Sequence, residues 1–176
     1  MLFRSGTVTV GGNLIATTNA NNGVIDLGTL AVDGTMALVT HNNGAATVVN
    51  DAGLNFAAST VGGALSATAT AGDIIDTGVL AITGASTFTV ADGENITLVS
   101  DNPFSSTVTF AASAGTIASV EINDSNALDL GTLPTTGNLT FTPGGNITDS
   151  GTVTVGGALA GTTDATRGST DPGELD

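Results

Sequence analysis

The feature that most constrains this chain is a string of seven residues that returns unchanged far along the sequence. Residues 6–12 read Gly-Thr-Val-Thr-Val-Gly-Gly, and the same string stands at 151–157. A degenerate copy, Gly-Val-Leu-Ala-Ile-Thr-Gly, lies midway between them at 78–84. The three copies are almost evenly spaced. The chain therefore contains two long repeats and the beginning of a third, which start near Gly6, Gly78 and Gly151.

Shorter repeats lie inside the long ones. Asp-Leu-Gly-Thr-Leu occurs at 26–30 and again at 129–133. Neighbouring glycine starts, such as Gly6 and Gly28, are separated by about 20 residues. A unit of this length is too short to bury an apolar face alone, but stacked units cover one another. The spacing predicts a solenoid of roughly eight rungs.

Each rung is predicted to consist of short β-strands. Val8 and Val10 alternate with Thr7 and Thr9, which is the period of two that marks a strand. Asn-Gly, Asp-Gly and Gly-Gly pairs between the alternating segments are suited to turns. The predicted fold is all-β, a parallel β-helix, and an antiparallel β array or sandwich remains the alternative because the same turn pairs also close hairpins.

The composition and net charge of the chain argue against some classes of binding partner. The chain has 25 Gly, no Cys, and 16 acidic residues against 2 basic ones, Arg4 and Arg167, for a net charge of −14. This charge repels phosphate backbones and anionic lipid headgroups, so neither nucleic acid nor a membrane surface is an expected partner. No apolar stretch is long enough to span a bilayer, so membrane insertion is not expected either.

Several longer segments resemble the repeats of filamentous haemagglutinin-type adhesins. The segments are 120–133, 137–157 and, with a strand followed by Asn-Pro-Phe, 96–104. The resemblance covers roughly residues 5–165 and implies a right-handed parallel β-helix, secreted by a bacterium through an outer-membrane partner or as an autotransporter passenger. Nothing in the chain resembles that family's amino-terminal secretion domain. Residues 1–165 are thus expected to form the solenoid, and 166–176 a polar tail that is disordered or a linker.

The function implied by this resemblance is an extracellular structural shaft at the bacterial surface. A module that binds glycans or host molecules is the alternative. A polysaccharide-acting enzyme ranks third, because such β-helix enzymes need clustered carboxylates together with a Lys or Arg, and the cations are missing. No catalytic residue and no cofactor is predicted.

Four aspartates recur just before the glycine that opens a strand: Asp26, Asp76, Asp129 and Asp149. A short acidic side chain at such a position is expected to accept hydrogen bonds from backbone N–H groups at a corner. Stacked aspartates can also bind calcium, but the Gly-Gly-x-Gly-x-Asp string of calcium rolls is absent. At most weak, incidental calcium binding is expected, with no assigned ligands.

The remaining candidate residues have structural interpretations. His41 is the one histidine and is expected in a surface turn, since no second imidazole or thiol accompanies it. Phenylalanines in strand-like positions are expected to pack in the core rather than stack on sugars. They are Phe56, Phe88, Phe104, Phe110 and Phe141. Four Asn-x-Ser/Thr sequons are expected by chance in a threonine-rich chain. They begin at Asn95, Asn123, Asn138 and Asn146.

The two copies of the repeated string also predict self-assembly. Val8 and Val10 in the first copy correspond to Val153 and Val155 in the second. An uncapped solenoid exposes strand edges that can pair with another chain. The expected partners are therefore a second copy stacked head to tail into a filament, or adjoining rungs of a longer parent protein.

Overall fold

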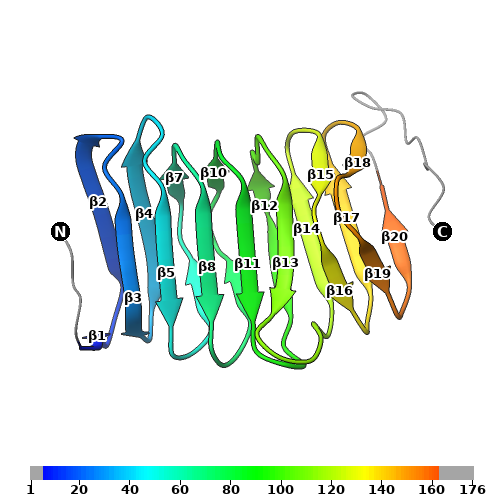
Figure 1. Cartoon of the computed structure of the whole chain (residues 1–176), viewed down its shortest axis with the longest axis horizontal. Helices are drawn as coiled ribbons and strands as arrows, with labels where there is room; N and C mark the ends of the chain where they lie inside the picture. The colour runs from blue at the N-terminus through cyan, green and yellow to red at the C-terminus, as the bar shows by residue number, and fades with distance from the viewer. Residues whose placement is uncertain (1–5, 163–176) are drawn as a thin grey trace.

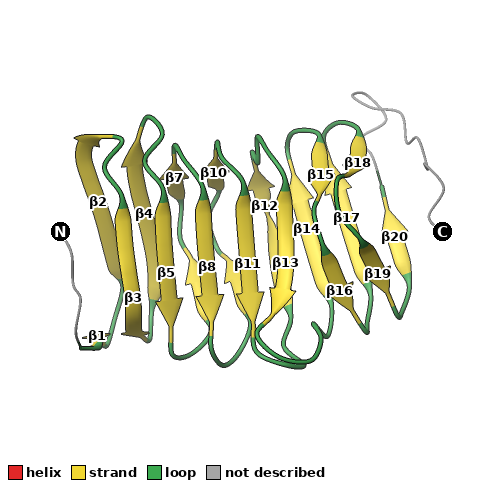
Figure 2. Ribbon diagram, viewed as in Figure 1, coloured by secondary structure: helices red, strands yellow, loops and turns green. Residues whose placement is uncertain are grey.

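The computed structural model describes residues 6–162 of the 176-residue chain. These residues form twenty strands and no helix. The chain coils from the N-terminal to the C-terminal end of a stack with a layer of strands on each side (Figure 1). Turns and loops lie along the two long edges between the layers (Figure 2).

Most strands fall into two sheets that face each other. Sheet 1 has eight strands in the order β1 (Val8–Val10), β3 (Ile25–Val32), β5 (Ala46–Asn50), β8 (Leu65–Ala69), β11 (Ser86–Val90), β13 (Val108–Ala112), β15 (Leu128–Leu130) and β18 (Ile147–Asp149). Sheet 2 contains β2 (Leu14–Asn21), β4 (Thr35–His41), β6 (Leu54–Phe56), β7 (Ser59–Val61), β9 (Ile74–Asp76), β10 (Leu80–Ile82), β12 (Ile96–Asn102), β14 (Val120–Asp124), β17 (Leu139–Pro143) and β20 (Leu159–Gly161). A short third sheet pairs β16 (Leu133–Thr135) with β19 (Val153–Val155).

Neighbouring strands within each sheet run parallel, one turn of the coil apart. Successive partners in sheet 1 are Ile25 with Ala46, Ala46 with Leu65, and Leu65 with Ser86. Each turn of the coil therefore takes about 20 residues, as the sequence repeats indicate. The prediction of a parallel β-solenoid is confirmed, and the antiparallel alternative is wrong for the described strands. About seven turns join the eight strands of sheet 1, so the stack rises roughly 34 Å at ~4.8 Å per turn.

The alternation of residues along each strand builds the core. In β11, Ser86, Phe88 and Val90 are buried while Thr87 and Thr89 are half-buried on the outer face. Inward residues stack on their equivalents in the next rung, as Phe88 pairs with Phe110. The rings of Phe88 and Phe110 lie nearly parallel with centroids 6.1 Å apart. Apolar side chains therefore form continuous files along the stack.

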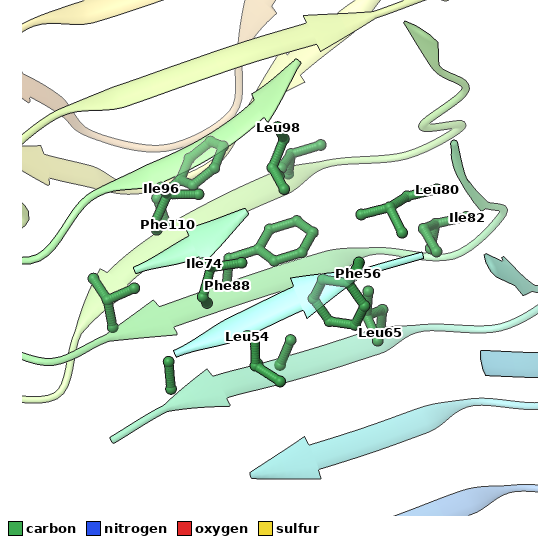
Figure 3. Close-up of a cluster of buried hydrophobic side chains, with 14 of the residues drawn as sticks. Leu54, Phe56, Leu65, Ile74, Leu80, Ile82, Phe88, Ile96, Leu98 and Phe110 are labelled. Carbon is green, nitrogen blue, oxygen red and sulfur yellow. The ribbon is translucent and has the colours of Figure 1, made fainter. Parts of the chain in front are cut away.

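Phenylalanine is concentrated in the middle of the core. Phe88 also meets the rings of Phe56 and Phe104 edge-on, at centroid distances of 6.5 and 6.0 Å. Figure 3 shows Phe56, Phe88 and Phe110 among leucine and isoleucine side chains from both layers. The expected core packing is confirmed for these three and Phe104, all at most 1 % exposed, and Phe141 is half-buried against the core.

The turns depend on small residues because rungs approach closely at the corners. Gly62 lies so near the backbone of the preceding rung that a Cβ atom there would overlap the carbonyl oxygen of Asn42. Asn42 itself has a positive φ of 53°, a conformation that asparagine tolerates better than most residues. These contacts explain why Asn-Asn-Gly and Gly-Gly strings fill this edge of the stack.

No helix among residues 6–162 is long and apolar enough to cross a membrane. The predicted tail at 166–176 lies outside the described residues, as do both arginines, Arg4 and Arg167.

Candidate functional site

In several strands a polar side chain occupies the last inward-facing position. Four of them are Asn or Asp side chains at most 7 % exposed, and we call them the bend caps: Asn50, Asp76, Asn102 and Asp124. Each stands at the last position of its strand, in β5, β9, β12 and β14. At this point the backbone leaves the sheet and some N–H groups of the neighbouring rung lose their carbonyl partners. A buried side-chain oxygen can replace those partners.

Asn50 satisfies both backbone groups of one residue in the preceding rung. Its Oδ1 accepts the N–H of Val32 at 2.9 Å, and its Nδ2 donates to the carbonyl of Val32 at 3.2 Å. The same Nδ2 donates to the carbonyl of Gly53 at 2.8 Å. The amide thus joins two rungs and the following turn.

Asp76 and Asn102 form the central pair of bend caps. Oδ1 of Asp76 accepts N–H groups from Val99 and Ser100 in the next rung, at 2.9 and 3.2 Å. Its Oδ2 accepts Nδ2 of Asn102 at 2.7 Å, and Oδ1 of Asn102 accepts the N–H of Leu80 at 2.7 Å. The two side chains therefore connect consecutive rungs of sheet 2 by hydrogen bonds.

Asp124 is the one bend cap with an unsatisfied atom. It pairs in register with Asn102, and its Oδ1 accepts the N–H groups of Phe104 and Asn126 at 3.2 and 2.9 Å. Its Oδ2 is buried without a hydrogen-bond partner. Burial raises the pKa of the Asp124 carboxyl from 3.8 to about 6; the two backbone N–H groups oppose the rise and nearby Asp101 adds to it.

The sequence contains a signal for these residues that repeated strings do not reveal. In β14, Val120 and Ile122 face inward, and the same alternation places Asp124 inward as well. Ala46, Val48 and Asn50 in β5 follow the same rule. A polar residue that continues the alternation of inward apolar residues along one strand therefore marks a bend cap.

The four predicted corner aspartates are not equivalent in the structure. Asp26, Asp129 and Asp149 lie on strands of sheet 1, whereas Asp76 lies on sheet 2. Asp129 pairs with Thr148, and Leu130 pairs with Asp149, so these two aspartates are one residue out of register.

Their surroundings also differ. Asp76 accepts backbone N–H groups, as described above. Asp129 accepts hydroxyl groups instead, from Thr107 at 2.6 Å, Ser150 at 3.0 Å and Thr148 at 3.3 Å. Asp26 and Asp149 have exposed side chains.

The predicted assembly valines all lie in the outermost described rungs. Val8 and Val10 on β1, like Val153 and Val155 on β19, are half-buried and pack against the core. His41 ends β4 with an exposed side chain, and its carbonyl accepts the N–H groups of Asn22 and Gly44. The structure brings none of the predicted residues together as a cluster.

The described rungs offer little for metal or acid–base chemistry. No three His, Cys, Asp or Glu side chains within residues 6–162 could hold a metal ion together. These residues include twelve carboxylates, one imidazole, His41, and no Lys or Arg. Three sequon asparagines hydrogen-bond to neighbouring rungs. Asn95 donates its N–H and Nδ2 to Asp73, Asn123 donates Nδ2 to the carbonyl of Val99, and Asn138 accepts the N–H of Ala158.

The outer face of sheet 1 carries a regular file of small hydroxyl side chains. Thr47, Ser66, Thr87 and Thr109 are partners in consecutive rungs. These side chains are exposed or half-buried, and they repeat at the ~4.8 Å spacing of the strands. The file is neutral and offers a hydrogen-bonding group on each of these four rungs, and Asp26 precedes it on β3.

A family of repeats matches the same rungs. The model of the family described as repeats of unknown function (DUF5649) matches residues 43–111 and 117–171, which is more than half of the chain. The chain belongs to this repeat family. No curated protein and no solved structure matches the chain.

The DUF5649 repeats coincide with units of the solenoid. The first match begins in the turn before β5 and ends inside β13, and the second begins at Ile117, just before β14. The distance between the two starting points is close to the distance between successive long repeats, which start near Gly6, Gly78 and Gly151. The family and the fold together identify a β-solenoid repeat protein. The family description states no function.

Proposed function

We propose that this chain is a length of non-catalytic structural shaft in a bacterial adhesin, secreted or held at the cell surface. The observation that carries the proposal is the unbroken stack. Paired strands and inward side chains continue from β1 to β20 without a second domain among residues 6–162. Stacking that needs only the neighbouring rung can be extended to any length, which suits a spacer.

Charge and chemistry of the described rungs support this role. Twelve carboxylates without a Lys or Arg among residues 6–162 disfavour lateral association of shafts through self-repulsion. A sugar-acid lyase or hydrolase would need a cation beside its carboxylates, and the described residues supply none. The haemagglutinin-type resemblance of residues 5–165 supports an extracellular location.

The test is the location of the protein in the bacterium that encodes it. Antibodies against the solenoid should label intact, unpermeabilised cells or detect the protein in the culture medium. Added protease should remove the surface label while a cytoplasmic control protein stays intact. Labelling that requires permeabilised cells would overturn the proposal.

Glycan binding is the second candidate, and the hydroxyl file on sheet 1 favours it. A row of Thr and Ser side chains can exchange hydrogen bonds with sugar hydroxyls. Replacing Thr47, Thr87 and Thr109 by Val keeps the shape of each side chain but removes its hydroxyl. If a glycan array shows binding that this triple variant loses, the chain is a binding module; no binding by the wild type leaves the shaft role alone.

A further inference from the structure

We propose that β19 and β20 of one copy bind β1 and β2 of a second copy, so that the solenoid continues head to tail across the joint. This inference rests on the geometry of the end rungs and does not depend on the shaft being extracellular. We define the entry rung as residues 6–17 and the exit rung as residues 151–162.

The entry and exit rungs are almost the same piece of structure. Nine of their twelve residues are identical. Val8 and Leu14 in the entry rung are six residues apart, as are Val153 and Leu159 in the exit rung, and both turns contain Gly-Gly. The two strands and the corner between them therefore have matching lengths.

The chain itself shows how such rungs stack. At the C-terminal end, Leu133 pairs with Val153 and Leu139 pairs with Leu159. At the N-terminal end, Val8 pairs with Leu30 and Leu14 pairs with Met36. All four rungs keep the spacing of six residues. The same register across the joint places Val153 opposite Val8 of the second copy, and Leu159 opposite its Leu14.

The backbone groups needed for this joint point along the stack, away from the rung that precedes the exit rung. Leu133 and Leu139 donate their N–H groups forward, to the carbonyls of Thr152 and Ala158. Val153 and Leu159 occupy the equivalent positions one rung later, and parallel strands repeat this direction from rung to rung. Their N–H groups would donate to the carbonyls of Thr7 and Asn13 in the second copy.

The apolar surface of the two rungs fits the same joint. Leu159 is 43 % exposed, although its partner in the preceding rung, Leu139, is fully buried. Ile15, which is 74 % exposed, lies on the outer face of the entry rung. Val8, Leu14 and Val153 are only half-buried although they face the core. A second copy would complete their burial and strengthen the contact.

The charge of the described rungs favours contact at the end of the stack over contact at its sides. The described carboxylates all lie between Asp26 and Asp149, so residues 6–25 and 150–162 carry no charged side chain. Side-by-side contact brings the acidic rungs of two copies together, whereas end-to-end contact joins neutral rungs. The partner that fits both ends is therefore a second copy of this chain.

One hydrogen bond of the internal stack would be missing at the joint. Oδ1 of Asn138 accepts the N–H of Ala158 at 2.9 Å, and Oδ1 of Asn13 accepts the N–H of Thr35 at 2.9 Å. The corner of the exit rung has Ala158 at this position. Ala158→Asn would offer an oxygen to the N–H of Asn13 in the second copy and should tighten association about fivefold.

Sedimentation velocity of the full chain over a range of concentrations tests the proposal, with circular dichroism to confirm folding. The wild type should form a concentration-dependent series of oligomers, which negative-stain microscopy should show growing along one axis. Ile15→Asp puts a charge on the edge strand and should weaken association at least tenfold. Thr60→Asp, which puts the same charge on an exposed position of an inner rung, is the matched control and should leave association unchanged.

Three results would overturn the head-to-tail joint. They are a strictly monomeric wild type at high concentration, equal effects of Ile15→Asp and Thr60→Asp, and no tightening by Ala158→Asn. The last comparison remains valid if Ile15→Asp fails to fold. None of these results bears on cell-surface location, so the shaft proposal and this inference can fail separately.

Discussion

Replacing Asp124 by Asn should remove most of the pH dependence that this buried carboxyl gives to the fold. The folded-state pKa is about 6 against 3.8 in the unfolded chain. Because the folded protein binds this proton more tightly, the contribution of Asp124 to stability is most favourable below pH 4 and is lost as the pH rises from about 4 to about 6 and above. At ~1.4 kcal/mol per pKa unit, the cost of ionising Asp124 in place reaches about 3 kcal/mol at pH 7.

The site has the shape to accept an amide. Asn102, its partner in the preceding rung, is a fully buried asparagine at the equivalent bend. Asp124→Asn should therefore raise the free energy of unfolding at pH 7 by up to about 3 kcal/mol. At pH 4, where the wild-type carboxyl is protonated, the two proteins should have similar stability.

Denaturant unfolding at pH 4, 5, 6, 7 and 8 at constant ionic strength measures this difference. Asp101→Asn is the matched control, because Asp101 is exposed and only adds to the pKa rise of Asp124; it should keep most of the wild-type pH dependence. The reasoning is refuted if Asp124→Asn changes stability equally at pH 4 and pH 7. It is also refuted if an NMR titration places the Asp124 pKa near the ordinary value of 3.8.

Three further substitutions test the packing of the rungs, each by denaturant unfolding. Phe88→Ala should cost about 3–5 kcal/mol, because the ring is fully buried among three others, and a loss below about 1 kcal/mol would contradict this core. Gly62→Ala should be strongly destabilising, because its Cβ would overlap the neighbouring backbone. Gly12→Ala is the control and should change stability little, because the space around Gly12 is open. Equal effects of the two substitutions would argue against the corner geometry. Asn50→Ala should cost about 2–4 kcal/mol since it leaves buried backbone groups unpaired, and a neutral result would mean that water replaces the amide.

The repeated strings favoured a parallel solenoid, because units of about 20 residues are too short to bury an apolar face alone and can cover one another when stacked. They left the antiparallel array open, because the same turn pairs also close hairpins. They could not predict which sheet a given string occupies. Asp26 and Asp76 precede similar glycines, yet they lie on opposite sheets. The step between partners also varies, since Ala46 pairs with Leu65 whereas the longer step from Val108 ends at Leu130. Because the turns between strands differ in length, similar segments can become strands of either sheet.

The bend caps show a second limit of reasoning from strings. Asp26 and Asp76 have similar neighbours in the sequence, but only Asp76 occupies the last inward-facing position of its strand and is buried at a bend. Burial depends on where the chain turns, and this is decided by the stacked neighbours as well as by the local residues. The alternation pattern does identify the inward positions, so the burial of Asn50 and Asp124 could have been predicted from the sequence.

The direction of the rung-to-rung hydrogen bonds has a mechanical consequence. These bonds point along the long axis of the stack, so a pull on the two ends loads them one rung after another instead of all at once. Each rung that peels away releases about 20 residues, which extend to roughly 70 Å in place of the ~4.8 Å that the folded rung occupied. The rest of the stack keeps its contacts, since a rung touches only its neighbours. Under tension we therefore expect the protein to lengthen in small, separate steps, with the intact rungs serving as a template on which the released strands can rewind.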